Sequence, residues 1–280
     1  MACFIIGGFI KPRILTIAGS DPSGGAGIQA DLKVIALLGG YGTSVITALT
    51  AQNTLGVQGI FPVPRSFIRE QLQAVLSDIS VDAVKTGMLA RAEIITLVAQ
   101  TLNEFKIEKV VLDPVMISGT GHPLLEKKAV QTLRDDLFPV AGLVTPNLSE
   151  ASVLTGLPVR TVADMKRAAM ALKEKIKGMV LIKGGHLTGA AIDLLYDGIS
   201  FREFSSPRIQ TPNIHGTGCT FSAAIAVFWG QGNPLIKAVE KAKDFITKAI
   251  AGAQPVGHGQ WATDPYRWLE NNKNKKEVSS

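Results

Sequence analysis

Short apolar runs alternate along the chain with longer segments in which apolar residues recur at helical spacing. The short runs predict strands at Arg13–Ala18, Thr43–Thr50, Gly56–Pro62, Ala83–Lys85, Lys109–Leu112, Gly142–Val144, Met179–Lys183, Ala191–Tyr196 and Ser200–Phe204. The longer segments predict helices at Gly25–Leu38, Arg65–Ser77, Arg91–Phe105, Leu124–Leu137, Leu148–Thr155, Val162–Ile176, Thr217–Trp229 and Pro234–Gly252. This alternation predicts a mostly parallel sheet covered by helices on both faces.

The domain organisation follows from length and continuity. The chain has 280 residues, of which 46% are apolar, enough to bury a substantial core. No linker, composition break or internal repeat divides it, so we expect one domain over residues 11–270. Residues 1–10 form an apolar extension, far shorter than the roughly 20 residues that span a bilayer, and residues 271–280 form a Lys-rich tail.

Charge and cysteine content narrow the class of partner. The net charge of +6 is dispersed, without a stripe of basic residues interleaved with aromatic ones, so we expect a small-molecule substrate rather than nucleic acid or membrane. Cys3 and Cys219 lie near opposite ends of the chain, and nothing else suggests secretion. A disulfide is therefore not expected, and a cytoplasmic location is.

Ligands of an open parallel sheet bind outside the carboxyl ends of the strands, so a site is expected in the loops that follow the predicted strands. Gly19–Gly27 is a glycine-rich loop after the first strand, and Gly25-x-Gly27 matches a dinucleotide fingerprint by letter. The next strand ends without the acidic residue that this fingerprint needs, and no Walker A sequence occurs. The glycines serve either a tight turn or the close approach of a ligand.

Carboxylates follow other predicted strands. Asp113 comes directly after one strand and can neutralise magnesium or phosphate charge, or it can serve as a turn residue. Asn147 and Glu150 have the spacing of a capping box, which also places an amide and a carboxylate on one helical face, where they could organise hydrated Mg²⁺. Lys85–Met88 either lines a pocket or packs in the core.

The segment with the most specific pattern is Gly216–Cys219, a Gly-x-Gly turn that opens directly into an Ala-rich helix. Unpaired N–H groups and the helix dipole make such a start an anion site, and the same field would favour the thiolate of Cys219. The alternative is an ordinary glycine turn with a buried cysteine. Lys183 ends a strand and could meet phosphate oxygens or lie in solvent, and His215 alone reads as a loop histidine.

Together these motifs supply the carboxylates, cation and anion hole that phosphoryl transfer requires. From Arg13 to Gly252 the chain resembles the ribokinase-like superfamily, and within it the hydroxymethylpyrimidine and phosphomethylpyrimidine kinases of thiamine biosynthesis. The resemblance implies a ribokinase-like three-layer α/β/α sandwich that uses ATP and Mg²⁺. It further implies two successive transfers, from the pyrimidine alcohol to its monophosphate and then to the diphosphate. Family members are commonly homodimers.

The resemblance also implies roles for individual residues. Gly19 and Asp31 match residues at the pyrimidine pocket, Gln52 matches a glutamine that hydrogen-bonds the aminopyrimidine, and Met88 matches a methionine that packs on the ring. The expected nucleotide and metal groups are Lys183, Asp113 and Thr217 for ATP, and Asn147, Glu150 and Asp113 for magnesium. The expected catalytic set is Gly216, Thr217, Gly218, Cys219 and Lys183.

The chain departs from the wider superfamily at Cys219, where most members carry an aspartate base. A thiol has a reference pKa of about 8.5, so we hypothesise that its pKa is lowered at the helix start for it to accept a proton. The nearest rival is a pyridoxal kinase of the same superfamily, against which Gln52 argues because its amide both donates and accepts. A nucleotide-binding regulator without catalysis and an NAD enzyme are further alternatives.

Overall fold

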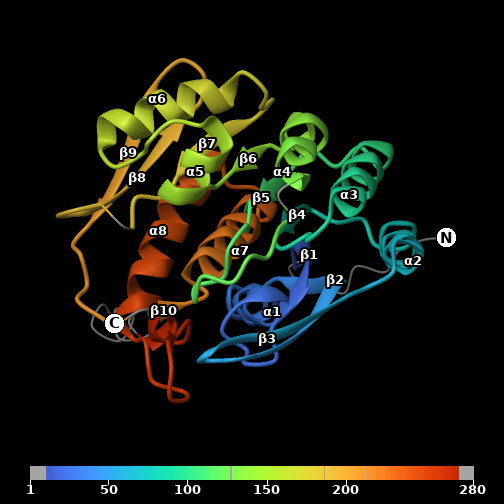
Figure 1. The fold of residues 1–280 in the computed structure, drawn as a ribbon, viewed down its shortest axis with the longest axis horizontal. Coiled ribbons are helices and arrows are strands. Elements are labelled where there is room, and N and C mark those ends of the chain that lie inside the picture. Colours follow the sequence, from blue (N-terminus) through green and yellow to red (C-terminus); the bar gives the residue numbers. More distant parts are fainter. Residues whose placement is uncertain (1–10, 127, 186, 213, 271–280) are drawn as a thin grey trace.

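The computed structural model describes residues 11–126, 128–185, 187–212 and 214–270 (Figure 1). Within them a nine-stranded sheet runs in the order β3-β2-β1-β4-β5-β6-β7-β8-β9. Its strands are β1 (Arg13–Ser20), β2 (Tyr41–Asn53), β3 (Gly56–Pro62), β4 (Ala83–Thr86), β5 (Val110–Leu112), β6 (Leu143–Val144), β7 (Met179–Ile182), β8 (Ala191–Tyr196) and β9 (Phe201–Ser206). The short strands β10 (Ile214–His215) and β11 (Trp261–Ala262) pair separately.

The helices occupy the connections between these strands. They are α1 (Gly27–Leu37), α2 (Arg65–Leu76), α3 (Ala92–Glu104), α4 (Ala129–Thr132), α5 (Leu148–Thr155), α6 (Val162–Lys173), α7 (Thr217–Gly230) and α8 (Leu235–Ala251). After α4 the chain continues through a π-helical stretch, Leu133–Leu137, and a 3₁₀ turn, Phe138–Val140.

Strand direction determines where a site can form. The neighbours β2, β1, β4, β5, β6 and β7 pair in parallel, so their carboxyl ends share one edge of the sheet. Only β3, β8 and β9 join antiparallel among the strands of the described ranges. The expected mostly parallel sheet is confirmed, and loops from distant parts of the chain meet at one edge.

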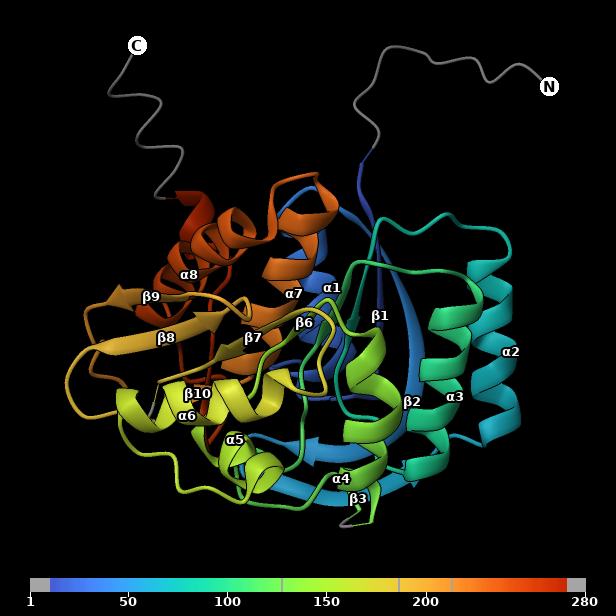
Figure 2. The same cartoon turned by 90° about the horizontal axis from the view of Figure 1, so that it is seen from above.

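The two faces of the sheet are covered by different helices (Figures 1 and 2). Leu15 and Ile17 of β1 pack into a core formed with α2 to α6, whereas Ile14 packs on the opposite side with α1, α7 and α8. Strands buried on both faces must be apolar at nearly every position, which explains the short apolar runs in the sequence. The three-layer α/β/α arrangement is as expected.

One predicted helix starts at the wrong place. The sequence pattern places it at Leu124–Leu137, but α4 begins at Ala129. The N–H groups of Leu124 and Leu125 donate to Met116 O, and that of Glu126 donates to Ala90 O. These long-range bonds hold the segment in an extended path, so the helix begins only after it.

The expected extension 1–10 and tail 271–280 lie outside the described residues, as do His186 and Asn213. In the part of the chain that the structure describes, no helix has the length and apolar character needed to cross a bilayer.

Candidate active site

Loops from β5 and β7 meet the start of α7 at the carboxyl edge of the sheet. A Cβ atom added to Gly218 would lie 3.2 Å from Lys183 Nζ and 3.5 Å from Asp113 Oδ2. Three segments that the sequence separates widely are therefore in direct contact. Asp113 and Lys183, the side chains expected to act on phosphate, therefore lie together at the start of α7.

Asp113 and Lys183 form an ion pair at this edge. Lys183 Nζ donates to Asp113 Oδ1 over 2.7 Å, and the two side chains are 13% and 2% exposed, respectively. Burial acts to lower the pKa of Lys183, but the negative charges of Asp113 and Glu150 outweigh it and raise the pKa. Lys183 therefore remains a cation, available to phosphate oxygens.

Asn147 and Glu150 form the capping box that the spacing predicts at the start of α5. Asn147 Oδ1 accepts from Glu150 N over 2.9 Å, and Glu150 Oε2 accepts from Asn147 N over 2.8 Å. Burial, with a further contribution from Asp113, raises the pKa of Glu150 to about 7 against the lowering effect of Lys183. The cap is confirmed, and its acid is divided between the protonated and the ionised form near pH 7.

The carboxylate oxygens of Asp113 and Glu150 are compatible with a hydrated magnesium ion. Glu150 is a buried carboxyl group beside Asp113, and an arriving cation would favour its ionised form. Mg²⁺ in proteins commonly keeps several waters and uses one or two carboxylates, which Asp113 and Glu150 supply. Within the described ranges, no cluster of three or more acidic, His or Cys side chains is found.

The start of α7 presents free main-chain donors. Gly216 is its N-cap with φ of 80°, and no side chain of the described residues caps the first turn. A Cβ atom on Gly216 would lie 1.7 Å from Gly25 O, so only glycine fits. The turn packs against the glycine-rich loop after β1, and its N–H groups are available to an anion.

The pKa of Cys219 differs from the sequence-based expectation. Burial of the thiol raises its pKa to about 11, although the Lys85 charge and a hydrogen bond from Gly27 N oppose that effect. The expected lowering of the thiol pKa by the helix field is therefore wrong. The desolvation of a half-buried sulfur exceeds the stabilisation that one helix end provides.

The residues expected around the pyrimidine occupy the neighbouring strand ends. Met88 is 8% exposed, and its Sδ would lie 3.1 Å from a Cβ on Gly19. Thr47 Oγ1 donates to Met88 O over 2.6 Å, which fixes the loop after β4. The half-buried amide of Gln52 lies 3.0 Å from His215 Nε2, so Gln52 stands directly beside the Gly216 turn.

Asp31 lies deeper than a pocket wall. It is fully buried, pairs with the equally buried Lys85 over 2.8 Å, and accepts from Thr16 Oγ1 over 2.6 Å. Burial raises the pKa of Asp31, with the Lys85 charge acting against it. In this structure both side chains are inaccessible to solvent, so Lys85 lies in the interior of the chain.

Two residues that the sequence analysis left without a site role connect the loops. His215 Nε2 lies 2.8 Å from Asp21 Oδ2, and both side chains are nearly buried. Burial acts to raise the pKa of Asp21, but hydrogen bonds from His215 and Ser23 outweigh it and bring the pKa to about 2. The sequence signal was present in the Gly19–Gly27 loop and in the position of His215 before Gly216, but the pairing spans 194 positions.

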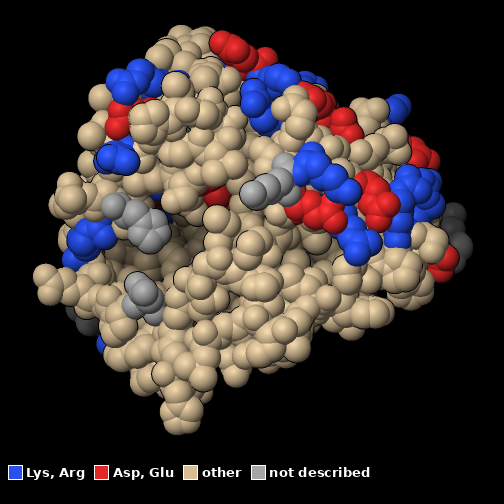
Figure 3. Space-filling view, viewed as in Figure 1, with Lys and Arg blue, Asp and Glu red and all other residues tan. Residues whose placement is uncertain are grey.

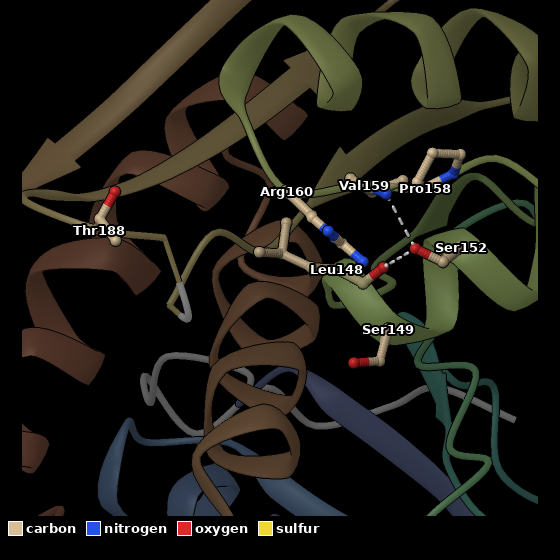
Figure 4. A pocket seen from close by; sticks show the side chains of 7 residues that line it. All are labelled: Leu148, Ser149, Ser152, Pro158, Val159, Arg160 and Thr188. Atoms are coloured by element: carbon tan, nitrogen blue, oxygen red, sulfur yellow. Dashed lines mark hydrogen bonds between the residues drawn. The ribbon is translucent and has the colours of Figure 1, made fainter.

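A cavity of about 650 Å³ opens at the start of α5 (Figure 4). Its lining residues are Leu148, Ser149, Ser152, Pro158, Val159, Arg160 and Thr188. Arg160, Ser149 and Thr188 surround the same opening, one from each of three segments. In the space-filling view the surface is hollowed left of centre, where α8 and β10 lie in Figure 1 (Figure 3). Space for a ligand is therefore present beside the capping box.

Comparison with known proteins gives consistent results. Residues 21–264 match the phosphomethylpyrimidine kinase family. The thiamine biosynthesis bifunctional protein ThiED of Geobacter sulfurreducens is 53% identical over 252 residues, which are 90% of this chain and 51% of that protein. The hydroxymethylpyrimidine/phosphomethylpyrimidine kinase of Escherichia coli is 47% identical over 88% of this chain and 94% of its own length.

Among solved structures, the ADP complex of Bacillus subtilis pyridoxal kinase superposes with a TM-score of 0.87 at 40% identity, covering 94% of this chain and all of that one. The chain spans about half the length of the bifunctional relatives it matches and nearly all of the Escherichia coli kinase.

Proposed function

Because the chain belongs to the phosphomethylpyrimidine kinase family, we propose that it transfers the γ-phosphoryl group of ATP to 4-amino-5-hydroxymethyl-2-methylpyrimidine. We further propose that the resulting monophosphate returns as the acceptor of a second transfer, which gives the diphosphate used for thiamine. The ribokinase-like fold of the chain is the scaffold that its pyridoxal kinase neighbour also has.

One observation supports the proposal above the others. Gln52, the group suited to an aminopyrimidine edge, is hydrogen-bonded to the residue that directly precedes Gly216. Recognition of the acceptor and stabilisation of the migrating phosphoryl group therefore fall within one site. Such proximity is what converts two bound reactants into an effectively unimolecular reaction.

The chemistry assigns a task to each group. The acceptor oxygen forms a bond to the γ-phosphorus while the bond to the ADP oxygen breaks, and Lys183 with the first N–H groups of α7 stabilises the charge on the transferring oxygens. Asn147, Glu150 and Asp113 would hold Mg²⁺, which neutralises phosphate charge when bound. The acceptor proton leaves as the new bond forms, and we assign Cys219 to receive it. Because burial raises the pKa of the Cys219 thiol to about 11, only its minor thiolate form can take that proton, and the positive charge of a bound Mg²⁺ would increase this fraction.

A pyridoxal kinase is the second candidate. The similarity to the Bacillus subtilis pyridoxal kinase, at 40% identity over almost the whole chain, favours it specifically. Gln52 favours the pyrimidine, because an amide beside a bound ring can donate to a ring nitrogen and accept from an amino group.

We also propose that residues 11–270 act as one catalytic domain of a cytoplasmic homodimer. The continuous sheet supports the single domain, and the common dimeric state of the family supports the assembly.

Product analysis tests the proposed function. Purified chain is incubated with ATP, Mg²⁺ and either the pyrimidine alcohol or pyridoxal, and products are identified by mass. We expect the pyrimidine monophosphate first and its diphosphate later. Phosphorylation of pyridoxal alone would establish the second candidate, and no transfer to either ring would refute both.

A further inference from the structure

The hydrogen bonds of His215 restrict the orientation of the Gln52 amide. Asp21 is ionised near neutral pH and can only accept, and its Oδ2 lies 2.8 Å from His215 Nε2. That nitrogen must therefore carry a proton. A protonated ring nitrogen cannot accept from an amide N–H, so the Gln52 atom 3.0 Å away must be the carbonyl oxygen, which shares the single Nε2 proton with Asp21 Oδ2. Oxygen and nitrogen of a side-chain amide have the same outline, so partner chemistry decides their placement.

The other end of the amide leads to the same orientation. Thr50 Oγ1 lies 2.9 Å from Ser20 O and 3.2 Å from the second terminal atom of Gln52. Ser20 O can only accept, so it takes the single proton of Thr50, and the hydroxyl oxygen is left to accept. The amide group that faces Thr50 is therefore the NH₂. Both neighbours require the same orientation of the side chain.

The histidine that imposes this orientation is itself held firmly. A Cβ on Gly25 would lie 2.7 Å from His215 Cδ2, so the ring packs directly on the loop after β1. Asp21 also accepts from Ala26 N over 2.8 Å and from Ser23 N over 2.9 Å, which fixes that loop. The β10–β11 pairing of His215 with Ala262 fixes the histidine backbone.

Among the hydrogen bonds of the residues that the structure describes, the fixed amide keeps one N–H and one oxygen lone pair unused, side by side and in a defined order. An amino group next to a ring nitrogen presents the matching acceptor and donor, so it can bind in only one sense. If the amide turned over, the ring would have to turn over with it, which would change the position of its hydroxymethyl group relative to Gly216–Cys219. Pyridoxal lacks an amino group beside its ring nitrogen and gains nothing from this order.

We propose that His215, held by Asp21, is a positioning residue that keeps the Gln52 amide in one orientation and so selects an amino-substituted ring edge. The inference rests on the proposed function, because it names the group through which that site distinguishes aminopyrimidine from pyridoxal.

The test compares His215→Leu, which removes the ring N–H, with His215→Gln, which retains a terminal N–H donor. For each variant kcat/KM is measured with the pyrimidine alcohol and with pyridoxal, and KM is measured for ATP. We expect His215→Leu to lower the pyrimidine-to-pyridoxal ratio of kcat/KM about 10- to 100-fold, as loss of an oriented hydrogen-bonding pair would. KM for ATP stays unchanged, and His215→Gln restores most of the ratio.

Equal losses with both acceptors, or no rescue by glutamine, would overturn the proposal. If His215→Leu does not fold, Thr50→Val provides the second variant: it removes the acceptor at the other end of the amide, and an unchanged ratio there would equally refute the idea. Calorimetric binding of the two rings to each variant keeps the inference separate from the function. A wild-type chain without turnover refutes the function, whereas the change in ring preference is read from binding alone.

Discussion

Several groups act in opposite directions on the pKa of Cys219. The helix start, Gly27 N and the charge of Lys85 favour the thiolate, but burial outweighs them and raises the pKa of Cys219 to about 11. A sequence motif identifies the field at a helix end, but the extent of desolvation follows only from packing. The Cys219 thiol is therefore protonated at neutral pH.

Alkylation kinetics test this protonation state. Against a free thiol of pKa about 8.5, we expect Cys219 to react with iodoacetamide about 10²- to 10³-fold more slowly at neutral pH. Because the pKa is raised, the rate should continue to increase above about pH 10. Peptide mass mapping separates Cys219 from Cys3, and a plateau below about pH 9 would show that the thiol is not desolvated in this way.

Cys219→Ala distinguishes the two transfers. An alcohol nucleophile needs its proton removed, whereas a phosphate oxygen hardly does. We expect the first phosphorylation to slow about 10²- to 10⁴-fold and the second to slow less. Single-turnover rates with each acceptor measure the difference, and equal slowing of both steps would exclude the base role.

At the scale of elements, the position of α7 depends on one close backbone contact. Gly216 has φ of 80°, and its α-carbon faces Gly25 O too closely for a side chain. We expect Gly216→Ala to displace the first N–H groups of α7 and to lower kcat/KM by about 10²-fold or more, since removal of one oxyanion donor already has such an effect.

Gly232 provides the matched control for this substitution. It lies beyond the other end of α7 with φ of 89°, and a Cβ there would meet no atom within 4 Å. Gly232→Ala therefore carries only the backbone penalty of about 1–2 kcal/mol. Steady-state kinetics and urea unfolding of both variants separate the collision from the strain, and equal kinetic effects would contradict the assignment.

The acid at the start of α5 makes stability depend on pH. The pKa of Glu150 is about 7 in the folded chain, above its ordinary value of 4.5. Its contribution to stability is therefore fully present below the unfolded value and is lost as the pH rises through about 7. We expect the melting temperature of metal-free protein to fall over that window, and Glu150→Gln to flatten the fall while the cap persists.

Magnesium should reverse this loss, because a bound cation favours the ionised acid. The rise in melting temperature on adding Mg²⁺ should be larger at about pH 8 than at about pH 6. If Glu150→Gln retained the full magnesium response, Glu150 would not be part of the metal site.

Elements with local determinants were predicted from the sequence most accurately. The helix Leu148–Thr155 and the strand Gly56–Pro62 have the predicted bounds, the helix being fixed by its own cap and by Gly156. The predicted start of α4 was wrong because the N–H groups of residues 124–126 donate to distant carbonyl groups. β10 and β11 are too short to give a periodic signal.

At the scale of the whole molecule, the site rests on an ion pair inside the fold. Asp31 of α1 and Lys85 of β4 are both fully buried and contact each other over 2.8 Å. The family resemblance implies that Asp31 lies at the pyrimidine pocket, and the sequence pattern gives no sign of this pairing, because the partners lie 54 positions apart. Sequence patterns do not predict which residues far apart in the chain come into contact.

Removing one partner of this pair should destabilise the entire chain. We expect Lys85→Met to reduce the free energy of unfolding by about 3–5 kcal/mol, because Asp31 is left buried without a counter-charge. Adding Asp31→Asn should recover much of the loss. Urea unfolding measures both, with Lys237→Ala as the control, since its exposed pair with Glu240 contributes at most about 1 kcal/mol.

The bond between Asp21 and His215 joins parts of the polypeptide 194 positions apart. A ligand that binds between these two loops therefore contacts an early and a late segment of the chain at once and crosslinks them reversibly. On heating, the ligand must dissociate before either segment can unfold. Resistance to melting thus becomes a direct gauge of occupancy, by which candidate vitamins can be ranked before a single turnover is observed.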